Sequence, residues 1–327
     1  MYSLYPLKFT PVLKHRIWGG NRIKEKFGLY DASVEKCGEA WVLSAVKDSE
    51  TIVENGHFAG NTLSEMCEVF MDDLMGEDAW KKFNEDFPLL LKIIDANDFL
   101  SVQVHPDDAL AKKKHGLRFG KTEMWYVIHA EPGAQIVAGF NEAVDREKLS
   151  KHIEAGTLKN ILKFHSMHTG DMIYLPAGMV HATGPGLLIA EIQQTSDITY
   201  RLYDWDRKDE HGQARELHIE NALDAVNFEL QPEIIRNFEP KINATTPMIE
   251  TPYFRASFIK LHSAVEKNVE LVDKCILYFA LNGSFLMKYN NGESLVKAGE
   301  CVLVPASADK MLLVPDIRAE IIEVIGM

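Results

Sequence analysis

The sequence lacks several features that would place it in broad classes of protein. Its four cysteines, Cys37, Cys67, Cys275 and Cys301, form no C-x-x-C pair. Neither a zinc knuckle nor a disulfide framework is therefore predicted, and a reducing compartment is favoured. No apolar run approaches the roughly 20 residues that span a bilayer, and the N-terminal residues show no signal-peptide pattern. These absences predict a cytoplasmic protein with no membrane partner.

Basic residues are scarce relative to acidic ones. The chain of 327 residues has 35 lysines and arginines against 48 acidic residues, a net charge of −13. Because nucleic-acid binding requires a basic face, this balance argues against a nucleic-acid partner. An anionic ligand must be held by a local group of cations within an acidic protein. The length allows two modest domains or one elongated domain.

The most informative segment is Gly170-Asp-Met-Ile-Tyr-Leu-Pro-Ala-Gly-Met-Val-His181. Residues 171–175 predict a short buried strand, Pro176 to Gly178 a tight turn, and His181 the start of the next strand. A turn restricted by proline and glycine holds the histidine in place at little cost in conformational entropy. A histidine fixed in this way is suited to bind a metal ion.

Three side chains upstream complete a candidate set of metal ligands. Gln103 and His105 alternate along a predicted strand, so both point to one face. Glu123 opens the apolar run 124–128 and can point inward beside them. With His181 they supply two imidazoles, one carboxylate and one amide oxygen, a mixture suited to a divalent ion such as Zn²⁺. The alternative is that His105 and His181 are ordinary strand histidines.

The order Q-x-H, then E, then one histidine after G-x5-P-x-G-x2-H is similar to the layout of the cupin superfamily. This resemblance implies jelly-roll barrels. We therefore expect an all-β dominated fold of two cupin barrels with a small α-helical insert. The expected metal-binding catalytic domain covers residues 1–235, with the insert at about 61–87. A degenerate cupin barrel without metal ligands is expected at 236–327.

Local patterns support this division. Thr62-Leu-Ser-Glu65 is a capping-box pattern, and apolar residues follow it at helical spacing. Residues 232–252, with several prolines, predict a linker into a last β-rich block. In that block Gly299 to Pro305 repeats the spacing from Gly170 to Pro176, but no histidine follows at the ligand position. The second barrel is therefore expected to hold no metal.

Three other segments predict helices, at 107–114, 142–163 and 216–228. Asp107 and Asp108 stand at the start of the first of these, where acidic side chains interact favourably with the helix dipole. This accounts for both aspartates without a catalytic role.

Further polar residues are expected near the ligands. Lys121 lies two residues before the carboxylate ligand, so in a strand it faces the same cavity, unless it is a solvated edge lysine. Glu191 lies among apolar residues, where an uncompensated carboxylate is unfavourable, and it could instead pair with an arginine elsewhere. Arg201 could meet a phosphate or a developing enolate oxygen. The alternative for Arg201 is a structural pair with Asp197 or Asp204.

Four segments resemble those of the type I mannose-6-phosphate isomerases, especially the short bacterial form. They are Gln103-Val-His-Pro-Asp-Asp108, Gly120-Lys-Thr-Glu-Met-Trp-Tyr126, Leu175-Pro-Ala-Gly-Met-Val-His181 and Ser196-Asp-Ile-Thr-Tyr-Arg201. Ile17-Trp-Gly-Gly20 and Gly38-Glu-Ala-Trp41 fit the same family, so the resemblance covers nearly the whole chain. Other cupins usually carry H-x-H in place of Gln103-Val-His105, which makes the combination specific. Long members carry a larger helical domain, whose contacts do not transfer to this chain.

The resemblance implies zinc-dependent, reversible interconversion of mannose 6-phosphate and fructose 6-phosphate through an enediol. The zinc ligands it implies are Gln103, His105, Glu123 and His181. The catalytic residues it implies are Arg201, Lys121, Glu191 and Asp197. The implied substrate-binding residues are Ser101, as a candidate phosphate contact, Lys121 and Arg201.

Several points stay open at the level of the sequence. The general base can be Glu191 or Asp197, and the oligomeric state is not determined, although a monomer is compatible with the chain. A metal-dependent cupin oxygenase is one alternative function, but Lys121 and Arg201 favour an anionic substrate. A non-catalytic sugar-binding cupin is another, and the intact ligand set argues against it.

Overall fold

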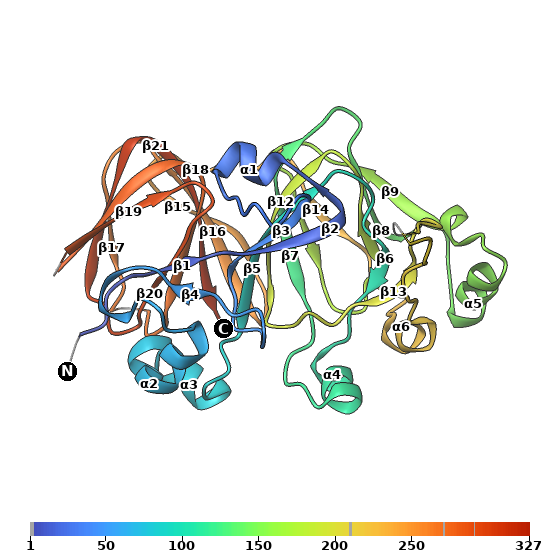
Figure 1. Ribbon diagram of the computed structural model, residues 1–327, viewed down its shortest axis with the longest axis horizontal. Helices are drawn as coiled ribbons and strands as arrows, with labels where there is room; N and C mark the ends of the chain where they lie inside the picture. The colour runs from blue at the N-terminus through green and yellow to red at the C-terminus, as the bar shows by residue number, and fades with distance from the viewer. Residues whose placement is uncertain (1–2, 209–210, 271, 291) are drawn as a thin grey trace. The chain divides into compact units, whose positions relative to one another are not determined.

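The computed structural model describes residues 3–208, 211–270, 272–290 and 292–327 (Figure 1). The contacts between Cα atoms divide the chain into two compact units. Unit 1 consists of Met1–Val12, Trp41–Leu91 and Glu239–Met327, and unit 2 of Leu13–Ala40 and Lys92–Phe238. Each unit is built mainly from β-strands, so the expected all-β dominated fold is confirmed.

Unit 2 is built on two sheets whose strands come mostly from its own segments. The larger has the order β14-β10-β7-β12-β5-β3-β2, with these strands at Glu233–Ile235, Met172–Leu175, Glu123–Ala130, Leu187–Gln194, Leu89–Ala96, Cys37–Leu43 and Val12–Gly20. The smaller has the order β13-β6-β11-β8-β9, with these strands at Tyr200–Tyr203, Val102–Val104, His181–Thr183, Gln135–Phe140 and Leu162–Ser166.

The inner faces of these two sheets share one apolar core. Trp125 and Ile173 of the larger sheet belong to the same buried cluster as Ile136 and Ala138 of the smaller sheet. The helices α5 and α6 lie beside the smaller sheet (Figure 1). A second buried cluster contains residues of that sheet and of both helices. The helices of unit 2 are α1 at Arg22–Phe27, α4 at Asp108–His115, α5 at Arg146–Glu154, a 3-10 turn at Leu158–Asn160 and α6 at Ile219–Ala225. The two sheets therefore form a barrel around side chains that converge from both.

Unit 1 is built on a sheet that is nine-stranded in the described residues. Its main path is β15-β16-β21-β18-β20-β1-β4, at Thr245–Glu250, Phe254–Leu261, Lys310–Gly326, Ile276–Tyr289, Cys301–Val304, Leu7–Thr10 and Ile52–Val53. Beside this path, β17 (Val265–Asn268) pairs with β21 and β19 (Gly292–Lys297) pairs with β18. The long strands β18 and β21 bend at register shifts and enclose their own apolar core.

Two helices of unit 1 follow the 3-10 turn Gly56–Phe58. They are α2 at Leu63–Met75 and α3 at Glu77–Phe83. The side chain of Thr62 accepts a bond from the Glu65 amide, and the Glu65 side chain accepts one from the Thr62 amide. The capping box, and with it the helix expected after Thr62, is confirmed.

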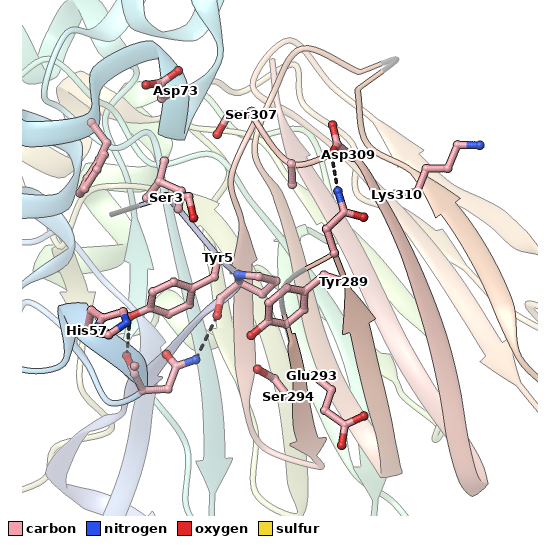
Figure 2. Close-up of a pocket in the computed structure, with 17 residues that line it drawn as sticks. Ser3, Tyr5, His57, Asp73, Tyr289, Glu293, Ser294, Ser307, Asp309 and Lys310 are labelled. Carbon is pink, nitrogen blue, oxygen red and sulfur yellow. Dashed lines mark hydrogen bonds between the residues drawn. The ribbon is translucent and has the colours of Figure 1, made fainter. Parts of the chain in front are cut away.

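Unit 1 also contains a pocket of about 850 Å³ (Figure 2). Tyr5, Tyr289, Glu293, Asp309 and Lys310 are among the residues that line it. Acidic side chains outnumber basic ones among these five, and no group of histidines and carboxylates with metal-ligand spacing is found in the described part of unit 1.

The two compact units do not separate at residue 235, where we expected the boundary between domains. Residues 1–12 and 41–91 cluster with the C-terminal block, although we expected them in the metal-binding domain. The reason is non-local pairing: β1 pairs with β20 on one side and with β4 on the other. The expected linker 232–252 is also not a simple linker, because β14 and β15 lie within it.

The predictions about helices hold in detail. Asp107 caps α4 by accepting a bond from the Leu110 amide, and α5 and α6 lie within the segments expected to be helical. The four cysteines are buried and free. Among the described residues, none of the helices has both the length and the apolar character needed to cross a bilayer.

Candidate metal centre

The candidate ligands are brought together by strand register in unit 2. His181, the first residue of β11, pairs with Gln103 on β6, and Gln103 pairs on its other side with Arg201 on β13. Side chains at directly paired positions lie on the same face of a sheet. Glu123, the first residue of β7, reaches the same interior from the larger sheet. Glu123 and His181 are almost completely buried.

The turn that carries His181 is attached directly to the segment that carries His105. The amide of Gly178 donates to the carbonyl of His105 over 2.9 Å, and the amide of Ala177 donates to the Thr122 hydroxyl over 3.1 Å. Gly178 has a φ of +90°, which a residue with a Cβ rarely adopts. The glycine of this turn is therefore required by the backbone, and two ligand-bearing segments form one hydrogen-bonded unit.

Both histidines turn the same ring nitrogen toward the interior. Nδ1 of His105 lies 2.7 Å from the carbonyl of Ile198, and Nδ1 of His181 lies 2.9 Å from that of Met179. A carbonyl only accepts, so each Nδ1 carries the proton and each Nε2 presents a lone pair to the interior. Burial, and then the charge of Lys121, hold the pKa of His105 well below its usual value. This is the tautomer that ligates a metal through Nε2.

The Glu123 carboxylate lies between these two lone pairs. Its Oε1 is 3.2 Å from Nε2 of His181, and its Oε2 is 3.8 Å from Nε2 of His105. Burial alone would raise the pKa of Glu123, but the charge of Lys121 holds it well below its usual value. Among the described residues, the buried Oε1 has no hydrogen-bond partner. Two acceptors therefore face each other without a hydrogen between them, an arrangement that a cation satisfies.

Two of the spacings between these atoms, 3.2 and 3.8 Å, are close to those of a tetrahedral metal site. The candidate ligand atoms of His105, Glu123 and His181 lie within 4.8 Å of one another, and theirs is the one such group found in the described residues. Bonds of about 2.0–2.2 Å to Zn²⁺ place neighbouring ligands roughly 3.3–3.6 Å apart. The donor set and the unsatisfied carboxylate oxygen thus fit a divalent ion.

Gln103 is the fourth candidate ligand. Its Nε2 lies 3.3 Å from Nε2 of His181, and its Oε1 lies 3.5 Å from the hydroxyl of the buried Ser101. Because rotation about one bond exchanges the amide nitrogen and oxygen, Gln103 can also present its oxygen to the interior. Ser101 therefore lies at the edge of the ligand group.

Lys121 reaches the interior as the sequence predicts. Its ammonium lies 3.1 Å from Nε2 of His105 and contacts Glu123. Burial alone would lower the pKa of Lys121, but Glu123 and then Glu191 raise it above its usual value. The alternative of a solvated edge lysine is wrong, because only 4% of this residue is exposed. The group of His105, Glu123 and His181 therefore already holds one positive charge, the ammonium of Lys121.

Glu191 is held in the same interior by three neighbours. The indole of Trp125 donates to its Oε1 over 2.9 Å, and the ammonium of Lys121 lies 3.8 Å from that oxygen. Lys92, a buried residue of β5, lies 3.2 Å from Oε2. Glu191 thus pairs with two lysines at the site, and not with an arginine away from it.

Asp197 and Arg201, the remaining predicted residues, lie in more exposed surroundings than Lys121 and Glu191. Asp197 is exposed in the loop after β12 and is one of the carboxylates that offset the lowering of the Lys14 pKa by burial and by Arg16. Arg201 is half-buried, and burial lowers its pKa. Its Nε is buried and has no hydrogen-bond partner among the described residues. Asp204, its expected structural partner, instead makes ion pairs with Arg207 and Arg215.

Two residues that contact the candidate site were missed in the sequence. Lys92 interrupts the apolar strand 89–94, and a lysine inside such a run was the available signal. Asp108 does more than begin a helix, because its Oδ1 accepts from the Gly120 amide over 2.7 Å and from Nε2 of Gln194 over 2.8 Å. Gln194 in turn accepts from the Thr122 amide over 2.9 Å. This network fixes the backbone on both sides of Lys121.

Comparisons with known proteins agree with this geometry. Residues 6–122 match the family described as phosphomannose isomerase type I, catalytic domain. The chain is 37% identical over 310 residues to the mannose-6-phosphate isomerase ManA of Bacillus subtilis, covering 94% of this chain and 92% of that protein. It is 45% identical over 223 residues to a mannose-6-phosphate isomerase of Streptococcus mutans, covering 68% of each.

A solved structure of the mannose 6-phosphate isomerase from Bacillus subtilis superposes with a TM-score of 0.81 and 29% identity, over 98% of this chain and 99% of that one. The sequence relatives, the family match and the shared fold lead to one assignment: this chain belongs to the type I mannose-6-phosphate isomerase family.

Proposed function

We propose that this protein interconverts mannose 6-phosphate and fructose 6-phosphate, using one divalent metal ion, zinc, held by Gln103, His105, Glu123 and His181. The observation that carries the proposal is the pair of buried acceptors, Oε1 of Glu123 and Nε2 of His181, 3.2 Å apart. Membership of the family supplies the reaction, aldose–ketose isomerisation. When bound, the ion acts as a Lewis acid that polarises the sugar carbonyl.

The reaction moves a proton between C1 and C2, so the site needs a base and a cation near the enediolate oxygens. We assign the base to Glu191, since it is buried beside Lys121 whereas Asp197 is exposed. Trp125 and Lys92 hold the Glu191 carboxylate in one orientation. Lys121 neutralises negative charge that develops on the substrate.

Arg201 and Ser101 are assigned to the substrate. Arg201 shares a row of strand positions with Gln103 and His181, so its side chain lies on the ligand side of the sheet. Ser101 lies beside Gln103 at the edge of the ligand group. Replacing Arg201 by alanine should lower turnover strongly and leave the metal content unchanged.

The test of the function is a coupled assay of fructose 6-phosphate formation from mannose 6-phosphate. It is run on metal-stripped protein before and after zinc is added, with glucose 6-phosphate in parallel. Activity that disappears on stripping and returns with zinc supports the proposal. A folded, zinc-loaded protein with no activity on mannose 6-phosphate would sink it.

The test of the base compares Glu191→Gln with Asp197→Asn. Turnover should fall by a factor of about 10²–10⁴ in E191Q, the usual contribution of a general base, and stay within a few-fold of wild type in D197N. Zinc content, measured by mass spectrometry, should be the same in both variants. The reverse order of the two turnovers would move the role to Asp197.

We also propose that the protein acts in the cytoplasm. All four cysteines are free, buried thiols, as is usual in a reducing compartment. Fractionation of cells that express the chain, followed by the same coupled assay, tests this location.

A further inference from the structure

Charges are balanced at the metal-binding end of the site. Two buried lysines, Lys92 and Lys121, lie against two buried carboxylates, Glu123 and Glu191. Lys121, the cation nearest the ligands, therefore already has Glu123 and Glu191 as counter-ions, and these raise its pKa. A dianionic phosphate would have to compete with Glu123 and Glu191 for these lysines. This end of the site is poorly suited to anchor it.

Several arginines gather at the end of the site away from the metal ligands, where Arg201 and Arg215 lie close to Asp204 and Arg201 also interacts with Glu216. Among the described residues Arg201 forms no ion pair within 4.0 Å, and its buried Nε is unpartnered. The segment 214–218 runs beside it, because the amide of His218 donates to the carbonyl of Arg201 over 2.8 Å. The amide of Arg201 donates in return to Nδ1 of His218 over 3.2 Å. These two bonds hold the segment that carries Arg215 against β13.

Arg215 is a second incompletely neutralised cation in this place. Its Nε lies 3.6 Å from Oδ2 of Asp204, a carboxylate that already binds Arg207 over 2.6 Å. Burial lowers the pKa of Arg215, and repulsion by Arg201 and Arg207 lowers it further, although Asp204 opposes this. The Arg215 side chain is still 28% exposed, so it is accessible to a ligand.

We propose that Arg215, together with Arg201, binds the phosphate group of the substrate, so that C1 and C2 of the sugar lie toward the metal ligands. The inference rests on the proposed function and adds the direction in which the substrate lies. Guanidinium groups bind phosphate oxygens through paired, charge-assisted hydrogen bonds. The chain has a net charge of −13, yet the described carboxylates do not fully neutralise these two neighbouring arginines. An anion is therefore favoured at this position.

The experiment compares zinc-loaded wild type with Arg215→Gln and Arg215→Lys. The KM for mannose 6-phosphate, and the inhibition constant of inorganic phosphate as a competitor, should both rise in R215Q. A rise of about 10- to 100-fold corresponds to the loss of a hydrogen bond to a charged group. The value of kcat should stay within about threefold. R215K should show a smaller rise, because lysine keeps the charge but not the planar fork.

Arg236→Gln is the matched control. Arg236 also pairs with one nearly buried aspartate, Asp171, at 2.9 Å, and its side chain is 39% exposed. If R215Q acted only by exposing an aspartate, then R236Q would have the same effect. We expect R236Q to leave KM and phosphate inhibition unchanged.

Zinc content and thermal unfolding of each variant show that it is folded. An unchanged inhibition constant for phosphate in R215Q, or a fall in kcat with unchanged KM, would overturn the inference. Inorganic phosphate binding is also measured directly by titration calorimetry. That measurement tests Arg215 even if wild type fails to isomerise mannose 6-phosphate, so failure of the function and failure of the subsite are distinguishable.

Discussion

The barrels of units 2 and 1 use the same strand-and-turn device with different side chains. β10 follows Gly170, with a φ of 91°, and β20 follows Gly299, with a φ of 89°. Each strand is followed by a proline, and the chain then enters another strand. That next strand begins with the buried His181 in unit 2 and with the exposed Lys310 in unit 1. Lys310 lines the pocket of Figure 2 and does not reach a ligand group.

Each barrel also contains a nearly buried glutamate. Glu323 on β21 pairs with Ser257 and Tyr278 on the neighbouring strands and forms an ion pair of 2.6 Å with Lys267. Glu123 faces two imidazole lone pairs in addition to Lys121. Each glutamate has one buried oxygen without a hydrogen-bond partner in the described residues. That oxygen of Glu323 faces the Lys267 ammonium, whereas that of Glu123 faces Nε2 of His181. What distinguishes the candidate metal site is therefore the pair of imidazole acceptors beside the carboxylate, because a buried carboxylate with an unpartnered oxygen occurs in both barrels.

Removing one imidazole should make the barrel of unit 2 unable to hold a metal ion, like the barrel of unit 1. In His181→Gln the ligand set loses a nitrogen that no neighbour replaces. Turnover and zinc affinity should fall by more than about 100-fold, since the loss of a partner behind a ligand already costs 10- to 100-fold. Zinc retained after dialysis against a chelator, measured by mass spectrometry, checks the affinity. Wild-type zinc retention in H181Q would show that His181 is not a ligand.

The two glutamates should respond in opposite ways to the same change. Glu123→Gln should remove zinc and activity. Glu323→Gln should leave both unchanged and lower the free energy of unfolding by about 1–3 kcal/mol, because Lys267 loses its counter-ion while remaining 16% exposed. Urea unfolding and zinc analysis of both variants provide the measurement. A loss of zinc in E323Q would contradict the distinction between the barrels.

The barrel of unit 1 should be sensitive to alkaline pH through Tyr278. Burial, and then Glu323, raise the pKa of Tyr278 well above its usual value. In the unfolded chain this tyrosine loses its proton near pH 10, whereas in the folded chain it keeps it. Stability should therefore fall above about pH 10, by up to ~1.4 kcal/mol per pH unit from this group.

Tyr278→Phe isolates that contribution. Its hydroxyl has no hydrogen-bond partner in the described residues, so the variant should fold normally at pH 7. The difference in unfolding free energy between wild type and Y278F, measured from pH 8 to 11, should change in favour of the variant as pH rises. A difference that does not vary with pH would remove Tyr278 from the explanation.

The smallest effects should come from helix caps, one in each unit. Thr62 caps α2 in unit 1 and Asp107 caps α4 in unit 2. Thr62→Ala and Asp107→Ala should each cost about 1 kcal/mol of stability and leave kcat/KM within about threefold. A larger loss of activity in D107A would mean that the position of Lys121 depends on the whole of α4 and not only on the hydrogen bonds of Asp108.

The sequence predicted the parts of the site that depend on local spacing. Gln103, His105 and the turn before His181 were identifiable because strand alternation and a Pro-Gly turn determine where side chains point. Lys92 was missed because a single charge within the apolar run 89–94 does not change the strand pattern. Its contact with Glu191 depends on the order of the strands in the folded sheet. Strand β12, which carries Glu191, lies between β5 with Lys92 and β7 with Trp125, so both side chains reach the Glu191 carboxylate.

The division of the chain was harder to predict for a related reason. The pairing of β1 with β20 joins residues nearly a whole chain apart, and no local periodicity encodes such a contact. The short strands β14 and β15 lie in a proline-rich segment, where composition favours a linker. The fold class and the grouping of His105, Glu123 and His181 thus followed from short motifs, whereas domain grouping depended on long-range pairing.

The hydrogen bond from Gly178 to the carbonyl of His105 has a consequence for the supply of metal in the cell. Because this bond joins two ligand-bearing segments through the backbone alone, their alignment does not depend on the ion. In the proposed zinc enzyme, a chain made during zinc shortage should therefore fold, persist and form an inactive reserve. When zinc returns, that reserve regains activity at the rate of ion uptake, without new protein synthesis.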